Sequence, residues 1–153
     1  MSPKYSSAVR KMFRCVVISV LIITAVGTQQ DVLSASNAKF ALDLYKRQAV
    51  SHKGRNIFMS PFSISVALAM THLGARGQTK SQMSKVLRFS DVEEDHLHQT
   101  FAEIQSVLNR PGQACKLYMA NRLFGRKSYK FLPKFLDAGQ LYYGAELKPV
   151  DFR

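Results

Sequence analysis

Few residues in this chain have the types and the spacing that catalysis or metal binding requires. His96 and His98 lie two positions apart on a predicted helix, so they point to different faces, and we expect solvated side chains rather than metal ligands. Cys115 falls within a predicted strand rather than at a helix start. The chain has neither a Gly-x-Ser-x-Gly elbow nor a His-Glu-x-x-His helix. We therefore expect no enzyme activity, no catalytic residue, no metal and no other cofactor.

Basic residues near the C-terminal end have a density that could bind a polyanion. Seven Lys and Arg residues and no acidic residue lie between positions 110 and 134, namely Arg110, Lys116, Arg122, Arg126, Lys127, Lys130 and Lys134. Such clusters are typical of surfaces that bind sulfated polysaccharides. The simpler interpretation is a solvated face, because alternate residues of a strand point to opposite sides and divide the cluster.

The loop Gly74–Gly77 raises the question of nucleic-acid binding. It is similar to the Gly-x-x-Gly loop with which KH domains clamp backbone phosphates. A KH fold needs a strand after the second helix, whereas Ser90 here opens a third predicted helix. We therefore expect no nucleic-acid partner, and we interpret the glycines as a helix cap and a turn.

The first 27 residues have the pattern of a secretory signal peptide. A basic head of Lys4, Arg10, Lys11 and Arg14 precedes the apolar run 15–26. That run is shorter than the ~20 residues a membrane-spanning helix needs, so we expect cleavage after Gly27, secretion to the extracellular space, and no membrane association afterwards. The alternative is an uncleaved anchor. Cleavage would leave Cys115 as the sole cysteine, which excludes an internal disulfide.

Periodicity and turn residues predict an α+β fold with the order helix, strand, three helices, strand, helix and strand. The expected helices start at caps among Ser34, Ser36 and Asn37, at Ser60 followed by Pro61, at the capping boxes Thr79/Gln82 and Ser90/Glu93, and near Pro133. The first is expected to end near Gln48, the second at Gly74 in the left-handed conformation, and the last at Gly144. Each helix has an expected inward face. In chain order, these faces are Ala41, Leu44, Tyr45 and Gln48 in the first helix; Phe62, Val66, Ala69 and Leu73 in the second; Met83, Val86 and Leu87 in the third; Leu97, Phe101, Ile104 and Leu108 in the fourth; and Leu132, Phe135, Leu136 and Gly139 in the last. The expected strands are 56–59 and 115–124, closed by Gly125, with a last extended piece at 146–152.

Several strings in this order resemble the serpin family. They are Asn56-Ile-Phe-Met-Ser-Pro-Phe-Ser-Ile-Ser-Val-Ala-Leu-Ala-Met70, Leu73-Gly-Ala-Arg-Gly-Gln-Thr79, Ala120-Asn-Arg-Leu-Phe124, Tyr143-Gly-Ala-Glu-Leu147 and Val150-Asp-Phe152. The resemblance implies residues 1–27 as signal peptide, 28–35 as a lead-in, and 36–153 as the N-terminal portion of a serpin domain. The implied fold is the helix-rich N-terminal part of the serpin fold, with strands of a large mixed sheet.

The resemblance also implies a function. Serpins inhibit serine or cysteine endopeptidases with an exposed bait loop that is cut and then inserts as a strand into the inhibitor's own sheet. Asn56, Ser60, Pro61 and Ser63 match the family's shutter, the region beneath the sheet that lets strands part. The reactive-centre loop is not in this chain, so we expect no inhibition by the chain alone and an extracellular serine protease as partner only in a completed form.

The second function that the resemblance implies is a non-inhibitory, secreted binding protein with a serpin fold. Serpins that bind heparin often use their fourth helix, but its expected start here, 91–95, is acidic. A glycosaminoglycan site would therefore fall on Arg126, Lys127, Lys130 and Lys134.

Overall fold

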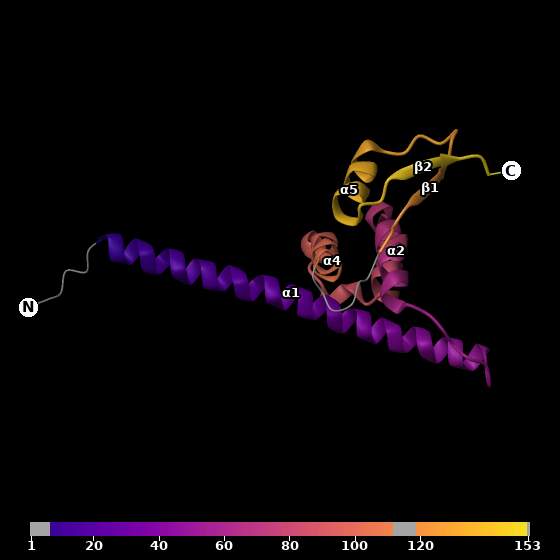
Figure 1. The fold of residues 1–153 in the computed structure, drawn as a ribbon, viewed down its shortest axis with the longest axis horizontal. Helices are drawn as coiled ribbons and strands as arrows, with labels where there is room; N and C mark the ends of the chain where they lie inside the picture. Colours follow the sequence, from indigo (N-terminus) through magenta and orange to yellow (C-terminus); the bar gives the residue numbers. More distant parts are fainter. Residues whose placement is uncertain (1–6, 112–118, 153) are drawn as a thin grey trace, which may run out of the picture.

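The computed structural model describes residues 7–111 and 119–152, with side chains from residue 29 onward. The elements are α1 (Ser7–Ser51), α2 (Pro61–Gly74), α3 (Gly77–Val86), the short 3₁₀ helix η1 (Phe89–Asp91), α4 (Glu94–Leu108), β1 (Leu123–Arg126), α5 (Pro133–Tyr143) and β2 (Leu147–Val150). Helices α2 and α4 lie against the C-terminal half of the long α1, while β1, β2 and α5 form a lobe on the far side of α2 (Figure 1).

The core forms where the helices meet. Phe101 of α4 is fully buried, and its ring contacts the rings of Phe62, Phe89 and Tyr143 at centroid distances of 5.6 to 6.2 Å. Around this aromatic centre lie the other buried apolar side chains, Leu33, Phe40, Val66, Ala69, Met70, Leu87, Val92, Leu97 and Ala145. All of the predicted helical segments contribute to this core or pack beside it.

β1 and β2 pair in parallel, with Leu123 opposite Leu147 and Arg126 opposite Val150. Helix α5 connects them, as a parallel pair requires a crossover. Gly125 lies inside β1, and the ring of Phe131 stands 2.5 Å from where a Cβ would be. The predicted role of Gly125 as the end of the strand is therefore wrong, since the glycine is needed to admit this ring.

Helix α1 does not begin at the predicted caps. It starts at Ser7 and passes through Ser34, Ser36 and Asn37 without interruption. The inward side includes Leu33, Ser36, Phe40 and Leu44, whereas Tyr45, expected on that side, is half exposed. The capping prediction failed because helical sequence precedes these residues, so their backbone N–H groups already have partners.

The predicted strand 56–59 is an irregular segment, and Phe58 is fully exposed. No strand among the described residues lies beside it, so its backbone lacks a ladder to join. Helix α2 begins as predicted, with Ser60 as N-cap and Pro61 at the first position. Gly74 does not end α2 in the left-handed conformation; it is the last helical residue, and its missing Cβ leaves room for the ring of Phe135.

The two predicted capping boxes are also wrong. Helix α3 starts earlier, at Gly77, whose φ of 57° lets the chain turn directly into the helix after Arg76. Helix α4 starts after Glu93, and neither start has a side-chain cap. Of the expected apolar positions, Val86 and Leu108 are exposed; Val86 lies at the end of α3, and the buried Leu87 follows it.

The C-terminal elements match the sequence in part. The described residues 119–122 of the expected strand 115–124 are not in a strand, and Cys115 lies outside the described residues. The start of α5 at Pro133, its end at Gly144 with φ of 59°, and the extended piece as β2 are confirmed, although Leu132 is exposed. No helix among the described residues combines the length and the apolarity that crossing a membrane requires.

Candidate functional site

The N-terminus of α2 brings together three of the four predicted shutter residues. The Ser60 hydroxyl accepts a hydrogen bond from the Ser63 backbone N–H at 3.4 Å, and the two hydroxyl oxygens are 2.8 Å apart, with either able to donate. Pro61 needs no partner at the first helical position, because it has no N–H. Asn56 is exposed on the preceding segment, and its side chain forms no hydrogen bond with the described residues.

A second polar contact lies one turn further along α2, between α2 and α1. The Ser65 hydroxyl is fully buried and donates to the Asn37 side-chain oxygen at 2.6 Å. Ser36, the neighbour of Asn37, is also buried, and its hydroxyl has no partner among the described residues. Ser65 was not among the residues predicted for this site, although a hydroxyl in an apolar stretch of helix is a signal that a polar partner must exist elsewhere.

These groups lie around the start of α2, with Ser60 and Ser63 on its exposed side and the buried Ser65 on the side that faces Asn37 of α1. We call these four residues the polar seam. Beside it, the segment 56–59 lies over a cleft of 310 Å³ that the end of α1 and Ile64 also line. Hydroxyls can exchange donor and acceptor roles by rotating, so such a seam can hold more than one arrangement of the neighbouring backbone at little steric cost.

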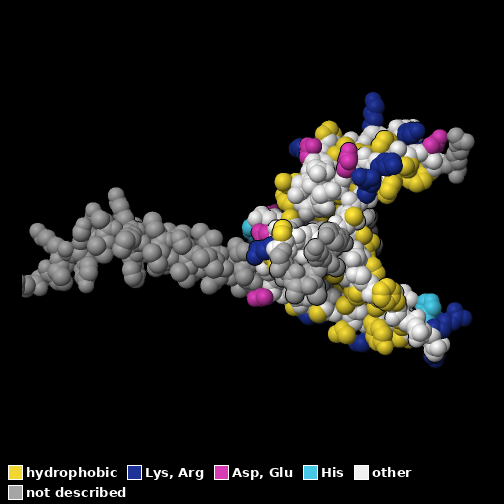
Figure 2. Space-filling view, in the orientation of Figure 1, with side chains coloured by type: hydrophobic (Ala, Val, Ile, Leu, Met, Phe, Trp, Pro, Cys, Tyr) yellow, Lys and Arg dark blue, Asp and Glu magenta, His cyan; other side chains and the backbone are white. Residues whose placement is uncertain are grey.

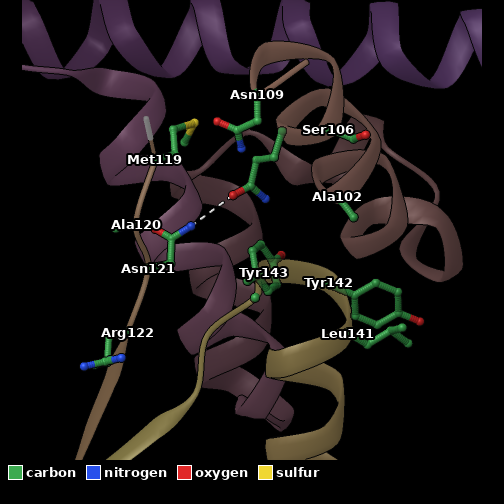
Figure 3. A pocket seen from close by; sticks show the side chains of 12 residues that line it. Ala102, Ser106, Asn109, Met119, Ala120, Asn121, Arg122, Leu141, Tyr142 and Tyr143 are labelled. Carbon is green, nitrogen blue, oxygen red and sulfur yellow. Dashed lines mark hydrogen bonds between the residues drawn. The ribbon is translucent and has the colours of Figure 1, made fainter. Parts of the chain in front are cut away.

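A larger groove of 780 Å³ lies between α4, residues 119–122 and the C-terminal end of α5 (Figure 3). Across it, the Asn121 amide donates to the Gln105 side-chain oxygen at 3.0 Å, and the Gln105 amide donates to the Phe101 carbonyl at 3.2 Å. Of the described residues that line the groove, Arg122 alone is charged, and the rest are amide, hydroxyl and apolar side chains. The contacts of the groove hold the segment that leads into β1 against α4.

The predicted polyanion residues occupy the lobe of β1 and α5. Arg126 ends β1, Lys127 and Lys130 lie in the following loop, and Lys134 is in the first turn of α5. All four are exposed, and none is in the ion pairs of the described residues, which join Lys39–Asp91, Lys80–Glu94, Arg88–Asp43 and His96–Glu93. Lys and Arg side chains are visible on several sides of this lobe in Figure 2.

The two histidines of α4 differ from each other. His96 is exposed, 3.6 Å from Glu93, as expected. The expectation that His98 is solvated is wrong, since its Nδ1 lies 2.7 Å from the Tyr143 hydroxyl and its ring packs beside His72. The pattern of α4 could not show this, because the partners come from α2 and α5. No group of three potential metal ligands occurs among the described residues.

Comparisons with known proteins place the chain. Residues 35–153 match a family described as serpin (serine protease inhibitor). The leukocyte elastase inhibitor of Sus scrofa is 52% identical over 78% of this chain, that of Homo sapiens is 47% identical over 79%, and serpin A3-2 of Bos taurus is 36% identical over 79%. The structure of emu (Dromaius novaehollandiae) ovalbumin superposes with a TM-score of 0.72 at 31% identity, covering 77% of this chain and 34% of that one.

The matched region makes up most of this chain but less than a third of the length of its relatives. The chain spans 31% of the length of the leukocyte elastase inhibitors of Sus scrofa and Homo sapiens. The family match covers α2 to β2 and α1 from residue 35 onward, which includes the core residue Phe40 but not the buried Leu33. With a family match over most of its residues and a fold that superposes on a solved relative, the chain belongs to the serpin family and corresponds to a partial, N-terminal portion of it.

Proposed function

We propose that this chain supplies the N-terminal portion of a serpin that inhibits a serine endopeptidase by bait-loop insertion. The observation that carries the proposal is the 52% identity of residues in the family region to a leukocyte elastase inhibitor. That name makes an elastase-type serine protease the first target to test. Inhibition belongs to a completed protein, because trapping needs a bait loop and a sheet for it to enter.

The polar seam supports a mechanical role in this proposal. Inserting a strand requires that neighbouring strands part, and the helix beneath them must tolerate two arrangements. Ser60 and Ser63 are exposed, and the hydrogen bond between their hydroxyls can be donated by either, so they can rearrange, whereas the partly buried Ser65–Asn37 bond fixes α2 to α1. We expect the outer part of the seam to move and the inner part to stay.

Exposed apolar side chains indicate where the rest of a serpin would pack. Figure 2 shows apolar side chains along the hollow between the end of α1 and the lobe of β1 and β2. Large apolar residues that are exposed in this chain include Leu42, Tyr45, Val50, Phe58 and Phe124. Covering such residues supplies about 25 cal/mol per Å² of buried apolar area. The matched region is 31% of the length of the pig relative, so about two thirds of that protein's sequence lies outside the match and is available to cover them.

A chimera tests the proposal. Residues 35–153 would replace the corresponding part of the pig leukocyte elastase inhibitor, which keeps its own remaining sequence and bait loop. After a protease cuts the bait loop, insertion adds a strand with new ladder hydrogen bonds, so the chimera should unfold at a clearly higher temperature than before the cut, as the parent should. A chimera that folds but gains no stability on cleavage would contradict the proposed role of this chain.

We also propose that the protein is secreted after removal of residues 1–27. The family match begins at residue 35, which leaves the basic head and the short apolar run outside the serpin domain. Secretion would bring the inhibitor to extracellular proteases.

The second candidate function is polyanion binding by Arg126, Lys127, Lys130 and Lys134, which a non-inhibitory serpin-fold protein could also perform. The exposure of these four cations and their absence from the described ion pairs favour it. Binding to heparin should be electrostatic and should weaken steeply with salt. On a heparin column, changing all four to Ala should lower the salt needed for elution.

The matched control carries the same loss of charge at another exposed site, the end of α1. It changes Lys46, Arg47, Lys53 and Arg55 to Ala. If both quadruple variants elute at the same salt, net charge alone accounts for retention and the assigned site is wrong.

A further inference from the structure

Two imidazole rings lie together inside the helical core. His72 of α2 is 1% exposed, and its ring centroid is 5.8 Å from that of His98 on α4. The ring of Phe89 in η1 stands nearly perpendicular to that of His72 at a centroid distance of 5.6 Å, and Tyr142 and Tyr143 of α5 pack around His98. The two histidines therefore join α2, α4 and α5 at one point, and nothing in the proposed inhibitory function uses them.

The hydrogen bonds determine which ring nitrogen of the neutral His72 carries the proton. The Ser84 hydroxyl donates to the Lys80 carbonyl at 3.0 Å, so it must accept from His72 Nε2–H, which lies at 2.8 Å. The other nitrogen, Nδ1, is buried and has no partner among the described residues. Protonation of His72 would place an N–H at this position with no acceptor, which a buried site tolerates poorly.

The charges around the pair also oppose protonation. On the α3 side lie Lys80 and Arg76, both positive, while the exposed Glu94 of α4 is engaged by Lys80. Burial first, and then Lys80, lower the pKa of His72. Burial, His72 and Lys80 lower the pKa of His98 to about 4.

On the α5 side, burial raises the pKa of Tyr143, so its hydroxyl stays neutral and supplies no negative charge to His98. Each of the helices packed around the pair thus contributes either positive charge or an uncharged group, apart from Glu94.

We propose that the His72–His98 pair is an acid-sensitive latch, which holds α2 against α4 and α5 near neutral pH and releases them as the pH falls toward 5. Two imidazolium ions at this spacing would repel each other inside the core, and the release of the helices lets both reach water. The latch would loosen the helix whose N-terminus carries the polar seam. The proposal of a latch does not depend on a role of the chain in protease inhibition.

The direction of the pH effect follows from the folded and unfolded pKa values. A histidine whose folded pKa is lowered binds its proton more readily when unfolded, so its stabilising effect is complete above the unfolded value and is lost as the pH falls toward the folded value. For His98, a shift from 6.5 to about 4 raises the unfolding constant roughly 20-fold between pH 7 and pH 5. His72 is shifted in the same direction and adds to this change.

Urea unfolding of the full chain at pH 7 and pH 5, followed by circular dichroism, measures this change. His72→Phe keeps an aromatic ring, and His98→Asn keeps a donor near Tyr143; each should reduce the pH dependence relative to the parent. The controls are His52→Gln and His96→Gln, which alter exposed histidines and should leave it unchanged. If the first pair of variants retains the parent's full pH dependence, the latch is wrong.

A direct titration of the unmodified chain tests the proposal without any substitution. The chain has four histidines, so nuclear magnetic resonance should resolve four imidazole signals. We expect His72 and His98 to stay neutral well below the ordinary imidazole pKa of about 6.5, unless the helices separate. Four signals that all titrate near the ordinary value would overturn the proposal.

Discussion

Replacing Ser65 by Ala should weaken the contact between α1 and α2. Ser65 is fully buried and donates a 2.6 Å hydrogen bond to Asn37, which is itself partly buried. A neutral hydrogen bond contributes about 1 kcal/mol net, and a partner left without its bond costs about 1–3 kcal/mol when water cannot replace it. Because Asn37 can partly reach water, we expect a loss of about 1–2 kcal/mol, or roughly 3–6 °C in melting temperature.

A double-mutant cycle with Asn37→Ala isolates this interaction from the effect of alanine on helix propensity. Unfolding of the parent, the two single variants and the double variant in urea should give a coupling energy of about 1 kcal/mol. Ser81→Ala, at an exposed position of α3, is the matched control, and it should be neutral or slightly stabilising. A coupling energy near zero, or a Ser65→Ala variant as stable as Ser81→Ala, would refute the reasoning.

Three further predictions follow from local features. Gly125→Ala should lower the free energy of unfolding in urea by about 1–3 kcal/mol, because the Phe131 ring must move. Gly139→Ala, where a Cβ would make only ordinary contacts, should lower it less, and equal losses would contradict this reasoning. Ser60→Pro and Pro61→Leu in the chimera should favour polymers on native gels after mild heating, since each disturbs the start of α2, and persistent monomers would reject the shutter assignment. Mass spectrometry of secreted protein should find Thr28 first; an intact Met1 would instead indicate an anchor.

The sequence predicted best those features that depend on neighbouring residues. Ser60 and Pro61 begin α2, and Gly144 ends α5, because each acts on the backbone within one turn. The family was evident for the same reason, since its motifs are short and local. The capping box at Thr79 failed because Gly77 turns the chain into α3 before Thr79 is reached, and that at Ser90 failed because Ser90 lies in η1 and α4 starts only after Glu93.

Features that depend on distant partners were not predictable. The expected face of α1 was displaced because contacts with α2 and α4 decide which residues are buried, and Asn37 finds its partner 28 residues away. His98 is half-buried because Tyr143, 45 residues later, packs over it. The ends of β1 depend on pairing with β2, which follows α5 in the sequence. No periodicity within one segment contains this information.

The most direct test of the proposed function is covalent trapping of a protease. The chimera that carries residues 35–153 of this chain would be incubated with an elastase-type serine protease, beside the unmodified pig inhibitor and a chimera with an altered bait loop. We predict a complex of inhibitor and protease that survives boiling in detergent for the first two proteins only. Complete cleavage of a folded chimera without any such complex would contradict the account.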